Sequence, residues 1–134
     1  SLSLHCVYQM LMGMSMEALL KGVLVAQGEK IVEKGRVTKS FKTHQLRKLA
    51  RDIDVSIFPF SGDDLKILDN LSPYIEWAGR YPLPLVAEKV IIKGHSSTET
   101  RLQGDLWDRL YEHLRGVGWV SKGRGKRLYF NKKP

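Results

Sequence analysis

The residues able to do acid–base, nucleophilic or metal chemistry in this chain are four histidines and one cysteine, and they are scattered. His5, His44, His95 and His113 form no pair at the spacing of helical or hairpin metal ligands, so we expect neither a metal site nor a cofactor. Cys6 lies in an apolar stretch, where a thiol acts as a small hydrophobic side chain. The sequence contains neither G-x-S-x-G nor a Cys–His signature, so it does not predict nucleophilic catalysis.

The chemistry that the charge pattern favours is anion binding, because the formal net charge is +8 and two segments are basic without an acid. The second segment interleaves Trp119, Tyr129 and Phe130 with its cations, a mixture suited to base stacking and phosphate neutralisation. The alternative is that these aromatic residues cover the end of the fold while the charges are merely solvated. The basic residues are Lys34, Arg36, Lys39, Lys42, Arg47, Lys48 and Arg51 in the first segment and Arg115, Lys122, Arg124, Lys126, Arg127, Lys132 and Lys133 in the second.

The candidate contacts for nucleic acid or phosphate are drawn from both segments, together with one histidine and one more arginine. Arg80 precedes Pro82 and is placed to bond the last carbonyls of a helix, and that structural role is the stronger interpretation. The G-R-G sequence at 123–125 is too short for a phosphate loop and is interpreted as a turn. The candidate contacts are Arg36, Lys42, His44, Arg47, Arg80, Lys122, Arg124, Lys126 and Arg127.

These side chains need a folded scaffold, and the length and composition of the chain are sufficient for one. The 134 residues, 43% hydrophobic and 27% charged, fit a single domain with one core. We expect residues 1–118 to form a helical bundle and residues 119–134 to add a basic tail or hairpin to the same domain. A single cysteine gives no internal disulfide, so the cytoplasm is the expected location.

The segment from Leu4 to Gln27 is apolar on nearly all sides at helical spacing, which predicts a central helix covered by other elements. Its polar residues form one seam, which we expect to face outward or toward a second copy of the chain. Glu17 and Lys21 are spaced for an ion pair and would be costly inside a bilayer, so a membrane span is not predicted. The seam consists of His5, Gln9, Gly13, Glu17 and Lys21.

Two further helices are predicted in the middle of the chain. Residues 29–42 are predicted to be a loop, after which Thr43 is expected to cap a short helix over residues 44–53. Ser61 is expected to cap the next helix, in which Pro73 should start a fresh turn or introduce a kink.

The C-terminal third is predicted to contain one long helix and a hairpin. Residues 79–96 are the least regular part, with a short strand or extended arm expected at 89–93. Thr98 begins an amphipathic helix that Gly116 and Gly118 are expected to end. The β-prone stretches that follow are expected to pair as a hairpin.

Three pieces of the sequence, in this order, resemble the HEPN family. The run M-E-A-L-L-K-G-V-L-V-A-Q-G at 16–28 resembles the E-x-x-x-K segment of that family's long helix, T-H-Q-L at 43–46 resembles the T-H-x-L that opens its next helix, and R-Y-P at 80–82 resembles the R-Y-P that often ends its third. The resemblance spans residues 7–85. It implies an all-α, up-down helical bundle, often dimeric, that acts in RNA biology, toxin–antitoxin modules or nucleotide handling, in some members beside a nucleotidyltransferase.

The catalytic branch of that family carries R-x(4–6)-H, in which the arginine and histidine cleave RNA without a metal ion. Here His44 follows Arg36 as R-x7-H and His113 follows Arg109 as R-x3-H, so the motif is absent. Arg109 and His113 share a helix face and are the remaining candidates for a degenerate site, although a solvated or core-edge pair is the stronger interpretation.

We therefore expect a non-catalytic HEPN-like module that forms a homodimer and binds RNA, a nucleotide, or a cognate antitoxin or nucleotidyltransferase, with no membrane as a partner. Two alternatives stay open. One is a ribonuclease that uses the atypical pair Arg109 and His113 or the pair Arg36 and His44. The other is a winged-helix-like DNA-binding protein that uses residues 98–133.

Overall fold

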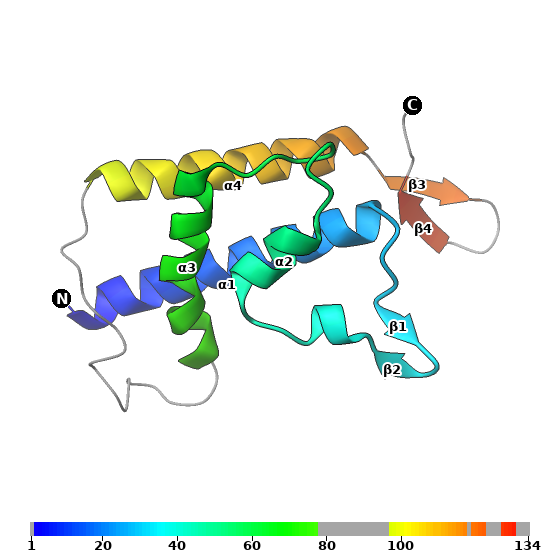
Figure 1. Cartoon of the computed structure of the whole chain (residues 1–134), viewed down its shortest axis with the longest axis horizontal. Coiled ribbons are helices and arrows are strands. Elements are labelled where there is room, and N and C mark those ends of the chain that lie inside the picture. The colour runs from blue at the N-terminus through cyan, green and yellow to red at the C-terminus, as the bar shows by residue number, and fades with distance from the viewer. Residues whose placement is uncertain (1, 78–96, 118, 123–126, 131–134) are drawn as a thin grey trace.

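The computed structural model describes residues 2–77, 97–117, 119–122 and 127–130 (Figure 1). Most of them are helical, which confirms the predicted all-α bundle with a small C-terminal hairpin. Residues 79–96, with Arg80 and the strand or arm expected at 89–93, lie outside the described residues. The elements are α1 (Leu2–Ala26), β1 (Val32–Glu33), β2 (Arg36–Val37), the short 3-10 helix Lys39–Phe41, α2 (Leu46–Asp52), α3 (Gly62–Trp77), α4 (Ser97–Val117), β3 (Trp119–Lys122) and β4 (Arg127–Phe130).

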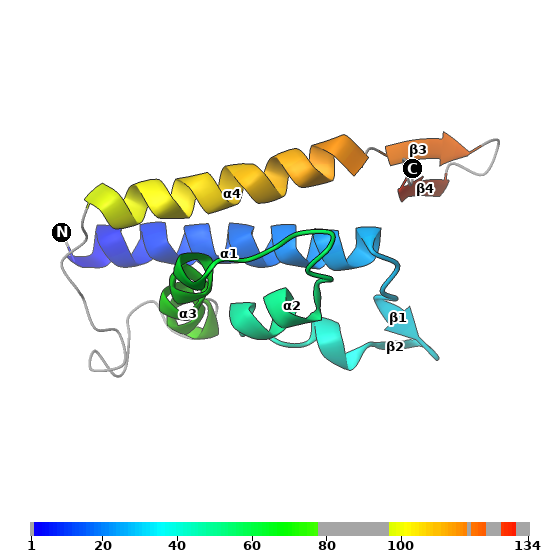
Figure 2. The ribbon, with the colours of Figure 1, turned by 45° about the horizontal axis from the view of Figure 1, so that its top comes forward.

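Helix α1 is the centre of the bundle and contacts each of the other three helices. Figure 2 shows α4 running along one side of α1, while α2, α3 and the β1–β2 hairpin lie on the other side. The prediction of a central first helix is therefore confirmed. The exposed faces of α4 and α2 therefore lie on opposite sides of the molecule.

The core is centred on the C-terminal half of α1, where Met16, Leu20, Val23 and Leu24 are fully buried. Each such side chain contributes roughly 1.5–3 kcal/mol through removal from water, so this cluster supplies much of the stability of the bundle. Leucines of the three later helices, which recur at helical spacing, pack against it there. They include Leu46 and Leu49 of α2, Leu68 and Leu71 of α3, and Leu106 and Leu110 of α4.

The prediction that the polar seam of α1 faces outward or toward a second copy is wrong for its N-terminal half. Gln9 is buried and its side-chain carbonyl accepts a hydrogen bond of 2.9 Å from the amide of Gln103 on α4. Gly13 is also buried, and a Cβ there would stand 2.7 Å from Cγ1 of Ile75 on α3. The seam is polar or small because two other helices pack against it, and the hydrogen bond between the two glutamines satisfies the buried side-chain carbonyl of Gln9.

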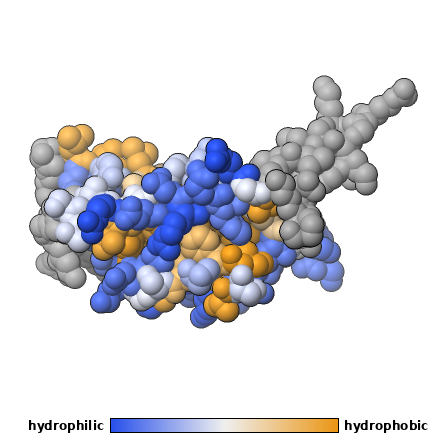
Figure 3. All heavy atoms as spheres, turned by 90° about the horizontal axis from the view of Figure 1, so that it is seen from above, coloured by the Kyte–Doolittle hydropathy of each residue, from blue (hydrophilic) through white to orange (hydrophobic). Residues whose placement is uncertain are grey.

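The exposed side of α1 is instead apolar. Figure 3, which looks onto α4, shows hydrophobic spheres gathered along one edge at the end where α1 begins. Five side chains spaced by one helical turn make up this apolar stripe, and they are between 43% and 70% exposed. The apolar stripe consists of Leu4, Val7, Tyr8, Leu11 and Met14.

The segment predicted to be a loop, residues 29–42, contains an antiparallel hairpin. Val32 pairs with Val37 and Glu33 with Arg36, which leaves Lys34 and Gly35 as a two-residue turn. Both turn residues have positive φ, 51° and 75°, as a type I′ hairpin turn requires. The sequence carried part of the signal, because Gly35 tolerates a positive φ and the β-branched Val32 and Val37 lie two residues from the turn on either side.

Helix α2 begins later than predicted, at Leu46, and Thr43 is not its cap. The Thr43 hydroxyl accepts a hydrogen bond from the Gln45 N–H at 3.1 Å, which forms a local turn. The Leu46 N–H is satisfied by the hydroxyl of Ser72 on α3, also at 3.1 Å. The partner comes from a neighbouring helix, so local sequence could not reveal it.

Helix α3 begins as predicted. The Asp64 N–H donates to the Ser61 hydroxyl and the Ser61 N–H donates to the Asp64 carboxylate, which is a reciprocal capping pair. The fresh turn expected at Pro73 is wrong, because α3 continues through it to Trp77. Ser72 does not cap a new turn, since its hydroxyl donates to the Leu68 carbonyl one turn earlier.

The C-terminal elements follow the prediction. Helix α4 starts one residue before Thr98 and ends at Val117, and β3 then pairs antiparallel with β4. The register places Trp119 opposite Phe130 and Lys122 opposite Arg127. The turn expected at 123–125, with Arg124, lies outside the described residues, as does Lys126.

Candidate nucleic-acid interface

The first basic segment is an exposed array of cations that are almost all unpaired. Among its seven basic residues, Arg47 alone forms an ion pair within the part of the chain that the structure describes. The others are exposed, and we call them the basic surface. The basic surface consists of Lys34, Arg36, Lys39, Lys42, Lys48 and Arg51.

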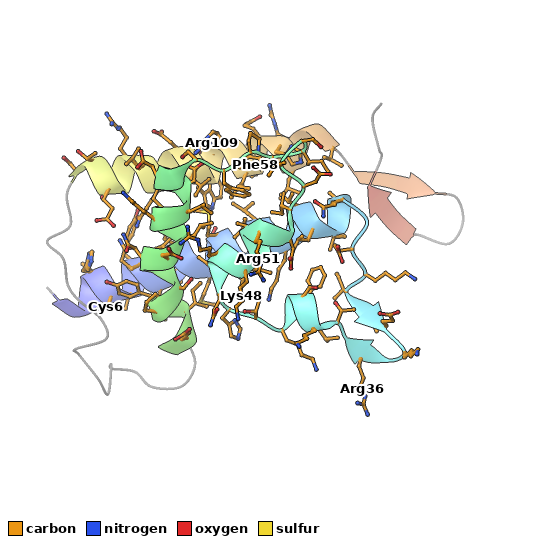
Figure 4. The ribbon with its side chains drawn as sticks, in the orientation of Figure 1. Cys6, Arg36, Lys48, Arg51, Phe58 and Arg109 are labelled. Carbon is orange, nitrogen blue, oxygen red and sulfur yellow. The ribbon has the colours of Figure 1, made fainter. Side chains whose placement is uncertain are left out.

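The β1–β2 hairpin presents the first cations of this surface. The turn places Lys34 at the tip of the hairpin, and Arg36 projects away from the bundle (Figure 4). The base of the hairpin is closed by Thr38, whose N–H donates to the Ile31 carbonyl and whose hydroxyl donates to the Lys30 carbonyl, both at 2.8 Å. These bonds close the base of the hairpin, which follows α1 along the chain.

Helix α2 presents the last two cations of the surface. Leu46, Leu49 and Ala50 are buried against the core, and this fixes the rotation of the helix. Lys48 and Arg51, three residues apart, therefore share the exposed side (Figure 4). Phosphate oxygens are the ligands that two such adjacent free cations bind most readily in water.

Two residues predicted to contact nucleic acid have internal partners instead. The Arg47 guanidinium donates to the Asp69 carboxylate on α3 at 2.7 Å. Nδ1 of His44 lies 2.7 Å from Glu17 Oε1, while the other oxygen of Glu17 accepts from Lys21 at 3.3 Å, as predicted. The first contact joins α2 to α3, and the second joins the residues just before α2 to α1.

The candidate catalytic pair on α4 is also held by internal contacts. Arg109 makes a two-bond ion pair with Asp64 at the start of α3, and its guanidinium carbon lies 5.9 Å from the ring centre of Phe58. The His113 ring meets the same phenylalanine edge-on at 5.9 Å. Burial pushes the pKa of Asp64 upward, but hydrogen bonds from Arg109 and Ser61 outweigh it and leave that pKa below its ordinary value.

The arginines and histidines weighed for ribonuclease chemistry do not converge. Figure 4 shows Arg36 on the hairpin and Arg109 against α4, on opposite sides of the molecule. His44 lies against α1 through Glu17, and His113 lies on α4. Among the described residues, Arg109 and His113 both pack on Phe58 but Arg109 is paired with Asp64, and Arg36 lies elsewhere, so the candidates form no common site.

A groove between α2 and α3 adjoins the basic surface, and the sequence alone did not reveal it. The groove encloses about 610 Å³. Lys48 and Arg51 line it from α2, together with the Arg47–Asp69 ion pair, and Glu76 lines it from α3. Its floor is apolar and consists of Ala50, Ile53, Val55, Phe60, Leu65 and Pro73.

Among the described residues, no group of three histidine, cysteine, aspartate or glutamate side chains stands close enough together to hold a metal ion. In the same part of the chain, one helix, Leu4–Ala26, has the length and composition to cross a membrane, with a mean hydropathy of 1.2. Core helices of bundles pass the same test, and Glu17 and Lys21 pair within this one.

No protein-family model, curated protein or solved structure matches this chain.

Proposed function

We propose that this chain is a non-catalytic helical module that binds RNA through its basic surface. The observation that carries the proposal is the set of six exposed cations between Lys34 and Arg51, none of which has an acidic partner among the described residues. Unpaired surface cations lose little when they approach phosphate, and they gain from the release of counterions. Kinship with the HEPN family stays part of the proposal, supported by the central apolar helix and the bundle around it.

The non-catalytic part of the proposal rests on the pairing of Arg109. Its guanidinium is committed to Asp64, and His113 packs on Phe58, so neither is placed to act on a scissile phosphate. A general acid–base histidine needs reach to a reacting atom together with a partner that orients it. The described residues place no such partner beside His113.

The apolar stripe supports self-association, with a second copy of the chain as its occupant. Its five side chains are each 43% to 70% exposed, and a contiguous exposed apolar patch marks an association surface. Tyr111 of α4 extends the apolar stripe. The indole N–H of Trp107 donates to the hydroxyl of Ser15 on α1, and the Tyr111 ring stacks on the Trp107 ring with 5.2 Å between ring centres. Residues 2–16 contain no Lys, Arg, Asp or Glu, so the stripe pairs with itself without charge repulsion.

An antiparallel pairing of the two copies also keeps their positive charges apart. The basic surface extends from the hairpin at the C-terminal end of α1 to α2 beside its middle, while the stripe occupies the N-terminal half (Figure 1). A twofold axis across the stripe therefore sends the two basic surfaces to opposite ends of the dimer.

DNA binding by α4 and the hairpin behind it is the second candidate, favoured by the observed order of helix and hairpin. The charges of α4 argue against its use as a recognition helix. Leu106 and Leu110 are buried on one side of α4, and the exposed side of the helix carries Asp105, Asp108 and Glu112. Carboxylates there would repel the phosphates of a groove.

The test of RNA binding is a titration of a short fluorescein-labelled single-stranded RNA, followed by anisotropy as salt is raised. With about six phosphate contacts, affinity should fall about 300-fold between roughly 50 and 200 mM salt. Absence of binding at low salt, or affinity that does not respond to salt, would reject the proposal.

A further inference from the structure

The α2–α3 groove combines two features that phosphate binding alone does not require. Lys48 and Arg51 stand on its α2 side, and beneath them lies a floor of apolar side chains. Val55 is 76% exposed at the end of this floor, and Phe60 and Leu65 beside it are only partly buried. The groove is therefore an open apolar surface directly beside two free cations.

We propose, building on the RNA-binding function above, that this groove takes an unpaired base of single-stranded RNA while Lys48 and Arg51 bind the adjoining phosphates. Its volume, about 610 Å³, is within the range of small-ligand sites and accommodates a nucleotide. A base is flat and largely apolar on its faces, so it gains by leaving water for a floor made of Val55, Phe60 and Leu65.

The chemistry of the groove favours a single strand over a duplex. In a double helix the base faces are stacked and only phosphates, sugars and groove edges are accessible, so the apolar floor would contribute nothing. Cations alone would then favour the duplex, whose density of phosphate charge is higher. Single-strand preference is the property that the floor adds to the basic surface.

Continuity with the hairpin cations favours RNA over an acidic peptide. Lys34 and Arg36 belong to the same run of unpaired charges as Lys48 and Arg51, and a peptide confined to the groove would leave them unused. Glu76 is the one lining carboxylate that forms no ion pair among the described residues. Glu76 lies one helical turn after Ser72, and the Ser72 hydroxyl accepts from the Leu46 N–H at the start of α2. The Glu76 carboxylate therefore repels phosphates from the part of the groove near the start of α2 and favours their binding near Arg51.

The experiment compares the labelled single-stranded RNA with the duplex formed with its complement, at one fixed salt concentration. Val55→Asn removes apolar floor without adding charge, and its high exposure keeps the cost to folding small. Ile57→Asn is the matched control, since Ile57 is exposed in the same turn but lines a different groove. We expect Val55→Asn to weaken single-strand binding about fivefold and to leave duplex binding and the Ile57→Asn control unchanged.

The possible outcomes separate this inference from the proposed function. If single strand and duplex bind equally, with affinity unaffected by Val55→Asn, the groove inference is wrong while RNA binding stands. If neither RNA binds, the proposed function fails and the groove inference fails with it. If Val55→Asn weakens the binding of a synthetic acidic amphipathic peptide and not that of the single strand, the groove is a peptide site and the inference is overturned.

Glu76→Gln should tighten single-strand binding about twofold through the loss of a repelling charge. Tighter binding of the duplex alone would count against the groove inference.

Discussion

At the scale of single residues, the fold depends on a few polar side chains that join helices distant in sequence. Asp64 is the clearest case, because it caps α3 and also holds Arg109 of α4. Gln9 and Gln103 form a second link between α1 and α4. These contacts occupy residues that would otherwise look functional, which is why Arg109 is a structural residue here.

Asp64→Asn should destabilise the protein by about 1–2 kcal/mol, since it removes a cap and one half of a partly buried ion pair. The folded-state pKa of Asp64 is lowered, so its stabilising effect is present above the ordinary value of 3.8 and is lost as pH falls through the lower folded-state pKa. Urea unfolding should show a gap between wild type and variant at neutral pH that closes in strong acid. Asp63→Asn, an exposed neighbour in the same turn, is the control, and an equal loss there would contradict the assignment.

Gln9→Leu should cost about 1–3 kcal/mol because it leaves the buried amide of Gln103 without its partner. The side-chain oxygen of Gln103 already lacks a partner among the described residues. Adding Gln103→Leu should recover part of the loss, since two apolar side chains then pack together. Strict additivity of the two changes in unfolding free energy would show that the pair does not act as a unit.

At the scale of elements, apolar spacing predicted the helices, and contacts remote in sequence decided what spacing could not. The leucines of α2, α3 and α4 occupy the core as their periodicity indicated. The seam of α1 was misread because the partners of Gln9 and Gly13 are Gln103 and Ile75, far along the chain. The β1–β2 hairpin was missed because its strands are two residues long, although its turn had the required glycine.

The two helical glycines Gly13 and Gly104 should respond oppositely to alanine. A Cβ at Gly13 would approach Ile75 on α3 to within 2.7 Å, whereas one at Gly104 meets nothing within 4 Å. Gly13→Ala should therefore lower stability by about 1–3 kcal/mol, while Gly104→Ala should raise it by about 0.5–1 kcal/mol. Thermal unfolding of both variants tests the closeness of α1 to α3, and a stabilised Gly13→Ala would contradict it.

At the scale of the whole molecule, the sequence indicated the positive charge of the segment but not which cations are paired or what surface surrounds them. The run of cations from Lys34 to Arg51 was evident, yet only the structure shows that Arg47 is paired and that Lys48 and Arg51 border a groove. The groove is formed by residues of two helices and the turn between them, a juxtaposition that no local pattern encodes. The apolar stripe lies on the N-terminal half of α1, whereas the basic surface extends from the hairpin at its C-terminal end to α2, so the proposed association and the proposed RNA binding use separate surfaces.

Leu11→Glu should convert the proposed dimer to a monomer, because it places a charge in the middle of the apolar stripe where Leu11 is 56% exposed. Sedimentation velocity over a range of protein concentrations measures the change. Val32→Glu, at an equally exposed position on the hairpin, should leave the dimer intact. A wild-type chain that sediments as a monomer at all concentrations would reject self-association.

The salt dependence of RNA affinity in variants of the basic surface tests the central claim most directly. The double variant Lys48→Gln/Arg51→Gln should reduce the magnitude of the slope of log affinity against log salt by about 1.4 relative to wild type, since each phosphate contact of a single strand contributes about 0.7. Arg101→Gln removes an equally exposed cation from α4, on the other side of α1, and should leave the slope unchanged. A slope unaltered by the double variant, or lowered as much by Arg101→Gln, would contradict RNA binding through this surface.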